Sequence, residues 1–194
     1  MEEALAGNNH RAAVKCLLLF DFLVGHVDKD RGRYAPVVAN ARKLLDAARK
    51  QAAIVVHARA DHAPGTPALN ISDAEHRPPR IMHGTPAAEI IPELAPQPSD
   101  YQLPKHRWSA FHGTHLDHTL RSRGADTIFL CGGSTEIGIA STAYAARDFG
   151  YNVVIVSDAC TSPKHDVHAL LMGEVFPRLA RVRTTAQALG MLED

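Results

Sequence analysis

Short apolar runs alternate with longer segments of helical periodicity along most of this chain, and this alternation constrains the fold more than any other feature. Runs rich in β-branched residues are typical of strands buried on both faces, and parallel strands are usually joined by helices. We therefore predict a three-layer α/β fold with a mostly parallel six-stranded sheet between helices. Strands are expected at Lys15 to Phe20, Ala53 to His57, Tyr101 to Lys105, Thr127 to Cys131, Asn152 to Val156 and Arg181 to Arg183.

Helices are predicted between these strands. The segment from Pro36 to Lys50 repeats apolar residues with a 3.6-residue period, which favours a helix with one face on the sheet. The stretch from Asp61 to Ser99 is rich in proline and is predicted to be mostly irregular, as a loop that shapes specificity. Further helices are expected at Leu116 to Ser122, Thr135 to Phe149, which Gly150 would end, and Pro163 to Leu179.

Length and composition limit the class of protein. A chain of 194 residues fits one domain, which we expect to span residues 1–194 with a flexible N-terminal extension at 1–12. Because 21 basic residues balance 21 acidic ones, recruitment of nucleic acid or an anionic membrane by overall charge is not expected.

The chain lacks the features of an exported or membrane protein. Its apolar runs are far shorter than the roughly 20 residues of a membrane span, and no secretory signal is visible. Three cysteines without CxxC spacing, Cys16, Cys131 and Cys160, are interpreted as reduced core thiols. The sequence therefore predicts a cytoplasmic protein.

Polar residues follow three of the predicted strands. Asp21 ends the first, Lys105 ends the third, and Gly133 to Ile139 follows the fourth. The carboxyl ends of parallel strands meet in one crevice, so these groups can converge. The helix start at Thr135 could bind an anion through backbone N–H groups, or Thr135 could simply be an N-cap. Individually, Asp21 could be a loop or capping residue and Lys105 an exposed lysine.

The chain has twelve histidines, and His112, His115 and His118 recur every three positions. This spacing can place imidazoles on one side of a helix, but no further ligand completes a recognisable zinc set. A solvated or partner-facing strip is the alternative that we favour. We predict no metal site and no cofactor, and the absence of G-x-S-x-G and HExxH motifs removes two common hydrolase classes.

Three segments together resemble a known family. Leu17 to Asp21 resembles a first strand that ends in a catalytic aspartate. Pro104 to Leu116 resembles the signature K-x-R-[YW]-S-A-F-x-G-T-x-L, and Gly124 to Ala159 resembles G-x-x-T-x-x-C-x-x-x-T-A-x-x-A-x-x-x-G-Y. On these motifs the chain is identified as a member of the isochorismatase-like superfamily, the cysteine hydrolases that include nicotinamidases, carbamoylsarcosine amidohydrolases and isochorismatases. The resemblance implies a Rossmann-like fold and a hydrolase.

The resemblance implies Asp21 and Lys105 as two members of an Asp, Lys and Cys triad. The third position is Gly138, and none of the three cysteines lies where it could substitute. Without a nucleophile the thioester route to amide hydrolysis is closed. The backbone N–H of Gly138 remains available to stabilise an oxyanion.

The family also contains isochorismatases with glycine at this position, and these cleave a vinyl ether. In that chemistry an aspartate protonates the enol-ether carbon, water adds to the oxocarbenium centre, and lysine supports the anionic substrate. We predict acid-assisted hydrolysis of this type at Asp21. The alternatives are an amidohydrolase that uses water activated by Asp21, and a noncatalytic ligand-binding or interaction protein on the same fold.

The substrate is predicted to be a small molecule. Ser134, Thr135 and Glu136 stand where isochorismatases have Y-A-H, and an inward Glu136 would disfavour a dicarboxylate such as isochorismate. The resemblance further implies a cis peptide near Gly133-Ser134 and a homodimer or homotetramer. The expected apolar pocket residues are Phe22, Trp108, Phe111 and Ile137, although Phe111 also suits the core.

Overall fold

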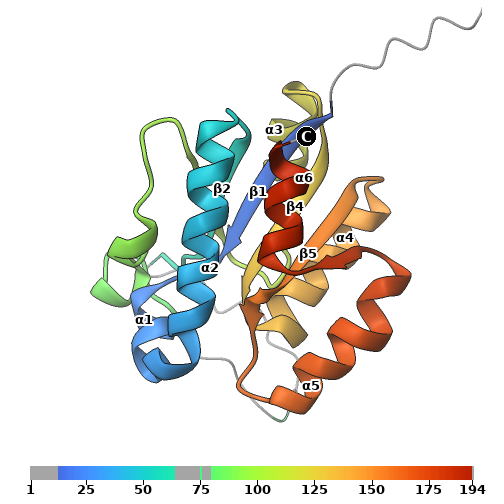
Figure 1. Ribbon diagram of the computed structural model, residues 1–194. Helices are drawn as coiled ribbons and strands as arrows, with labels where there is room; N and C mark the ends of the chain where they lie inside the picture. Colours follow the sequence, from blue (N-terminus) through green and yellow to red (C-terminus); the bar gives the residue numbers. More distant parts are fainter. Residues whose placement is uncertain (1–12, 64–74, 76–79, 194) are drawn as a thin grey trace, which may run out of the picture.

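One parallel sheet organises the molecule (Figure 1). The computed structural model describes residues 13–63, 75 and 80–193, and within them the sheet has six strands in the order β3-β2-β1-β4-β5-β6. The predicted α/β class and six-stranded parallel sheet are thereby confirmed. The strands are β1 (Val14–Phe20), β2 (Ile54–Ala60), β3 (Tyr101–Lys105), β4 (Ala125–Gly133), β5 (Asn152–Thr161) and β6 (Arg181–Arg183).

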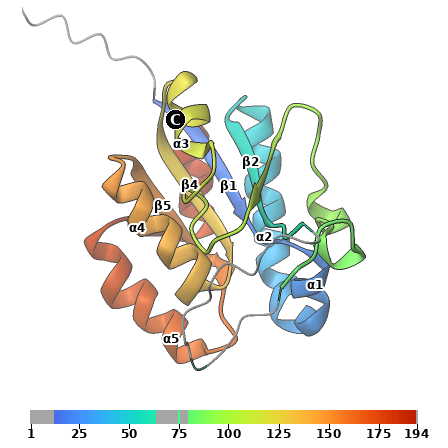
Figure 2. The same cartoon turned by 180° about the vertical axis from the view of Figure 1, so that it is seen from behind.

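Helices cover both faces of this sheet. Helices α2 and α6 lie on the face turned to the viewer in Figure 1, and α3 and α4 lie on the other face in Figure 2. The α-helices are α1 (Val24–Val27), α2 (Arg31–Lys50), α3 (Leu116–Ser122), α4 (Ala140–Asp148), α5 (His165–Leu170) and α6 (Thr185–Glu193). Single turns of other helix types are η1 (Asp28–Asp30), η2 (Pro86–Ala88), η3 (Pro92–Leu94), η4 (Thr135–Ile139), η5 (Leu171–Val175) and η6 (Phe176–Arg178).

Helix α2 begins before the proline that was expected to start it. The Asp30 side chain caps it by accepting a hydrogen bond from the backbone N–H of Arg33 at 3.1 Å. Pro36 therefore lies inside the helix, where it removes one hydrogen bond in the second turn. Burial of Tyr34 and Val37 on the sheet side offsets that loss, so packing outweighs the local preference.

Two helices were not predicted. Helix α1 has only four residues, too few for a periodic pattern to be recognised. Helix α6 begins where both the backbone N–H and the hydroxyl of Thr185 donate to Asp158 Oδ1, each at 2.7 Å. A local capping box adds to this contact: the backbone N–H of Thr184 donates to Gln187 Oε1 at 3.0 Å, and the backbone N–H of Gln187 donates to Thr184 Oγ1 at 3.4 Å.

The predicted helices after β4 and β5 are less regular than expected. The segment from Thr135 begins with the π-helical turn η4 before α4, and the segment after Pro163 is divided into α5, η5 and η6. Strand β5 continues to Thr161 instead of ending at Val156, with an irregularity that brings Thr161 opposite Gly133. Gly150 has φ 84° and follows α4 as predicted.

The described part of the proline-rich stretch, residues 61–63, 75 and 80–99, contains only η2, η3 and isolated bridges, in keeping with the prediction. Leu23, Ile81 and Ala88 form a small buried cluster that attaches it to α1. The rest of this predicted loop and the expected extension at 1–12 lie outside the described residues.

The main core lies on both faces of the sheet and includes the three cysteines, all free and buried. Burial raises the pKa of the Cys16, Cys131 and Cys160 thiols. This is the environment of inert core thiols. Among the described residues, none of the helices is long and apolar enough to cross a membrane.

Candidate active site

Asp21 stands at the carboxyl end of β1 in a constrained conformation. Its φ is 53°, in the left-handed region that non-glycine residues seldom adopt and that aspartate tolerates better than most. Its Oδ1 accepts a hydrogen bond from the backbone N–H of Ala60 at 2.7 Å, and its Oδ2 accepts one from Lys105 Nζ at 2.7 Å. The carboxylate is therefore fixed by donors from the ends of two other strands.

Lys105 is the last residue of β3, and its side chain is only 4% exposed. Its ammonium lies 2.7 Å from Asp21 and 4.2 Å from the centre of the Phe20 ring. A buried ammonium needs such partners to offset its lost hydration. The structure thus brings together Asp21 and Lys105, which lie 84 positions apart in the sequence.

The third part of the site is the turn after β4. The peptide between Gly133 and Ser134 is cis, at the place that the family resemblance implied. Ser134 occupies the cap position, and its backbone oxygen accepts hydrogen bonds from Ile137 and Ile139. Thr135 is not the N-cap: it lies inside η4, fully buried, with its Oγ1 2.9 Å from His168 Nδ1.

Gly138 is buried in η4 beside the ring of Phe20. A Cβ placed on Gly138 would lie 2.1 Å from Phe20 Cε1, far inside van der Waals contact. The space that a side chain on residue 138 would need is therefore filled by Phe20, whereas the predicted pocket residues Ile137 and Trp108 are 37% and 56% exposed.

Glu136 brings a second carboxylate to this turn. Its Oε2 is buried and has no hydrogen-bond partner among the described residues. Burial raises the pKa of Tyr34, and the charges of Asp21 and Glu136 raise it further, while Arg33 opposes them. Tyr34 is therefore a neutral phenol within electrostatic reach of both carboxylates, at a position that the sequence reasoning missed.

His26 and His168 were also missed. Burial lowers the pKa of His26 despite the opposing charge of Asp21, and Lys29 and Lys105 lower it further. Burial likewise lowers the pKa of His168, with His165 adding to the effect and Glu136 opposing it. His26 lies in the unpredicted helix α1 and His168 in the middle of α5, so neither stood out in a chain with many histidines.

The predicted apolar pocket residues are scattered. Phe22 is buried in the core directly after Asp21, whereas Trp108 and Ile137 are exposed. Phe111 is a core residue, not a pocket residue: its ring centre lies 5.2 Å from that of Phe149 and 5.8 Å from that of Tyr151. Those partners lie beside the amino end of β5, away from Asp21. Contact among the three rings buries aromatic surface there, which is favourable.

The regularly spaced histidines His112, His115 and His118 are all exposed, and two of them precede α3. In the part of the chain that the structure describes, no group of three or more His, Cys, Asp or Glu side chains is placed to hold a metal ion. The exposure of these three histidines fits the solvated strip that the sequence analysis favoured.

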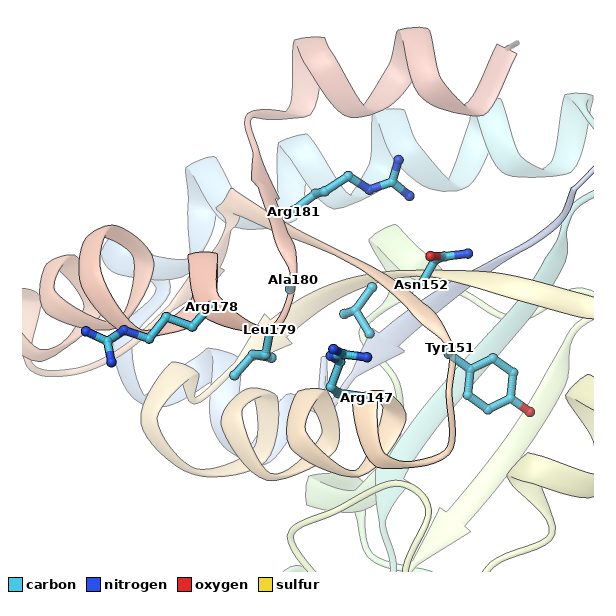
Figure 3. Close-up of a pocket in the computed structure, with 8 residues that line it drawn as sticks. Arg147, Tyr151, Asn152, Arg178, Leu179, Ala180 and Arg181 are labelled. Carbon is cyan, nitrogen blue, oxygen red and sulfur yellow. The ribbon is translucent and has the colours of Figure 1, made fainter.

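A separate open hollow of about 490 Å³ lies at the amino ends of β5 and β6 (Figure 3). Arg147, Arg178 and Arg181 are among its lining residues, and Figure 3 shows that their guanidinium groups do not converge on one point. Ligands of open parallel sheets bind beyond the carboxyl ends of the strands. We therefore assign the candidate active site to the Asp21 end.

Comparison with known proteins agrees with this fold. Residues 15–187 match the isochorismatase domain, and the chain belongs to the isochorismatase family. It is 38% identical over 176 residues to the isochorismatase family protein YwoC of Bacillus subtilis, a match that covers 89% of this chain and 91% of YwoC. It is 30% identical over 185 residues to maleamate amidohydrolase of Pseudomonas putida, covering 91% of this chain and 85% of that enzyme.

Among solved structures, an isochorismatase family protein from Burkholderia thailandensis is similar, with a TM-score of 0.87 and 32% identity. The match covers 93% of this chain and 96% of that one. Members of the family are hydrolases that include amidohydrolases. The protein is accordingly an isochorismatase-family hydrolase.

Proposed function

We propose that the protein hydrolyses a small molecule without a nucleophilic side chain, through proton transfer by Asp21. The observation that carries this proposal is the pairing of a fixed, buried Asp21 with a residue 138 that has no side chain. In our alignment with the family motif, position 138 corresponds to the nucleophile, and glycine cannot form a covalent intermediate. General acid–base catalysis is what the remaining groups offer.

The reaction that fits these groups is hydrolysis of a vinyl ether. Protonated Asp21 gives its proton to the terminal carbon of the C=C bond, and the ether carbon becomes an oxocarbenium centre. Water adds to that carbon and loses a proton to the Asp21 carboxylate. The hemiketal then collapses to an alcohol and a ketone. Lys105 Nζ and the N–H of Ala60 stabilise the carboxylate that remains after the first transfer.

Glu136 supports a limit on the substrate. Its buried, unpartnered Oε2 lies on the same turn as Gly138. A buried carboxylate oxygen without a donor is costly, so a ligand that supplies an N–H, O–H or cationic group gains affinity there. A dicarboxylate would instead meet repulsion. We propose that the substrate carries a hydrogen-bond donor near the reacting group. We also propose that the stretch 61–99 is the loop that determines specificity.

A second candidate is hydrolysis of a C–N bond by water that Asp21 activates as a base. The similarity to maleamate amidohydrolase favours this candidate. It uses the same carboxylate in the opposite direction, with Asp21 accepting a proton from the attacking water. The two reactions are separated by their products, because a vinyl ether yields a ketone and an alcohol, whereas a primary amide yields ammonia.

The test is a turnover screen with two matched panels, enol ethers of pyruvate and primary amides of the same acids. Release of pyruvate that is lost in Asp21→Asn supports the vinyl-ether reaction. Release of ammonia with the same dependence supports the amidohydrolase. A third outcome is that neither panel is turned over, but some compounds raise the melting temperature of both the wild-type protein and Asp21→Asn. In that case the noncatalytic ligand-binding alternative replaces both proposed reactions.

We also propose a homodimer or homotetramer. Five large apolar side chains are exposed among the described residues, and contact between subunits would cover those that lie in the interface. They are Trp108, Ile137, Tyr144, Phe149 and Leu170. Sedimentation equilibrium tests this proposal, and a monomer at micromolar concentration contradicts it. The three free buried thiols suit the cytoplasm, which is where we propose that the enzyme works.

A further inference from the structure

Phe20 connects the two halves of the candidate site. It is the last residue of β1, immediately before Asp21, and only 1% of its side chain is exposed. One edge of its ring faces Gly138 and its face carries the ammonium of Lys105. This ring therefore contacts both the charge pair and the turn after β4.

The contact with Gly138 leaves no room for a side chain at that position unless the Phe20 ring shifts. An ideal Cβ on Gly138 would meet Phe20 Cε1 at 2.1 Å, Cζ at 2.6 Å and Cδ1 at 3.0 Å. The atoms involved belong to a rigid ring in a close-packed core, so the overlap cannot be relieved by a flexible chain end. A side chain at position 138 is therefore destabilising while Phe20 is present, and a smaller residue at position 20 relieves it.

The contact with Lys105 is electrostatic. The ammonium lies 4.2 Å from the ring centre, within the range of a cation–π interaction, and is largely removed from water. Its hydrogen-bond acceptor among the described residues is Asp21 Oδ2. The ring face thus supplies a second partner that holds the ammonium against the carboxylate.

We propose that Phe20 is a positioning residue of this site, which occupies the space of a nucleophile and orients Lys105 toward Asp21. Positions 20 and 138 then form a coupled pair, and the sequence Phe20-Asp21 commits the site to chemistry without a side-chain nucleophile. The inference rests on the proposed function only where it concerns the effect of Phe20 on catalysis. Its tests use stability and chemical labelling, so they can fail or succeed independently of any substrate.

The first test measures the coupling with Gly138→Cys, Phe20→Val and the double variant. The native thiols are buried, with pKa values raised by burial, so iodoacetamide labelling of folded protein reports position 138. We expect Gly138→Cys alone to lower the melting temperature, and Phe20→Val to restore part of it and leave a folded protein that labels at residue 138. Melting temperatures that fall additively would overturn the coupling.

The second test separates positioning from packing. We expect Phe20→Leu, and replacement of Phe20 by 3,5-difluorophenylalanine, to raise the acetylation rate of Lys105 by roughly fivefold relative to Lys43 in the same digest. The fluorinated ring keeps nearly the same shape but has a weaker π face. The same replacement at the fully buried Phe129 is the matched control and should leave Lys105 unchanged. A rate that changes with leucine but not with the fluorinated ring would show that Phe20 only fills space.

Discussion

The two sides of the candidate site, the Asp21–Lys105 pair and the turn around Gly138, differ in how they relate to their sequence motifs. On the first side, residues that resemble the family's motifs meet at 2.7 Å. On the second, residue 138 is a glycine, and an aromatic ring from β1 lies where a side chain on that residue would stand. Under the proposed function, the site keeps its charge pair and works without a side-chain nucleophile.

The difference has a physical origin in the sheet. Strand pairing fixes where β1, β2 and β3 end, because Phe20 is paired with Ala58 and Ala60 with Lys105. A carboxylate and an ammonium at these ends must meet. The space beside Gly138 is set instead by the size of residue 20, which pairing does not constrain.

The largest expected effect comes from breaking the charge pair. Lys105→Met leaves the Asp21 carboxylate buried without its ammonium, and we expect it to lower the free energy of unfolding by about 3–5 kcal/mol. Urea unfolding at pH 7 measures this. The double variant Lys105→Met with Asp21→Asn has no buried charge and should recover much of the loss. Equal losses in the single and double variants would mean that Asp21 is not desolvated by the fold.

The next effect is on activity. Asp21→Asn keeps the shape of the side chain but cannot exchange a proton, and we expect kcat on any substrate found by the screen to fall by at least about 10². Asp46→Asn is the matched control, since Asp46 is a half-exposed acid on α2 whose ion partner is Arg42. Steady-state kinetics decide the point, and an active Asn variant would remove Asp21 from the reaction.

A smaller effect probes the other side of the comparison. Gly138→Ala adds one methyl group against Phe20, and we expect a loss of about 1–3 kcal/mol of stability. Gly190→Ala is the control: it lies inside α6 with nothing within 4 Å of the added Cβ, so it should stabilise the protein by about 0.5–1 kcal/mol. Thermal unfolding compares the two. Similar shifts for both variants would show that the Phe20 ring moves freely.

The sequence predicted the parts of the fold that depend on local patterns. The strands Tyr101–Lys105 and Arg181–Arg183 and the helix Leu116–Ser122 have the bounds expected from apolar runs and periodicity. Helix α2 was placed too late because it was predicted from an apolar repeat that begins at Val37, whereas the helix starts after the Asp30 cap. Helix α6 was missed although Thr184 and Gln187 form a capping box at its start, a local signal that the sequence prediction did not use.

The candidate site was predicted in its charges but not in its surroundings. Asp21 and Lys105 could be chosen because strand ends converge, and Gly138 because its motif lacks a cysteine. The role of Phe20 could not be foreseen, since a phenylalanine in an apolar run looks like any other core residue. The burial of the unpartnered Glu136 oxygen and its electrostatic effect on Tyr34 both depend on how η4 and α2 pack. No short-range sequence pattern encodes that packing.

The smallest expected effect is the dependence of stability on pH. His26 reports on the charge-pair side of the site, and His168 reports on the turn around Gly138. Burial lowers the pKa of both imidazoles in the folded protein below the value of about 6.5 that they have when unfolded. Between those values the unfolded chain binds more protons, so the free energy of unfolding rises with pH. The stabilisation is complete above about pH 6.5 and is lost as the pH falls through the folded values.

We therefore expect the free energy of unfolding, measured by urea titration, to decrease between pH 7.5 and pH 5, by less than about 1.4 kcal/mol per pH unit for each histidine. His26→Asn and His168→Asn should each flatten this slope, whereas His118→Asn, at an exposed position on α3, should leave it unchanged. His26 senses Asp21 and Lys105, and His168 senses Glu136 and contacts Thr135. If only His26→Asn flattens the slope, the part of the acid sensitivity that comes from the site belongs to the charge-pair side, and the remainder comes from His57 and His62, whose pKa values burial also lowers.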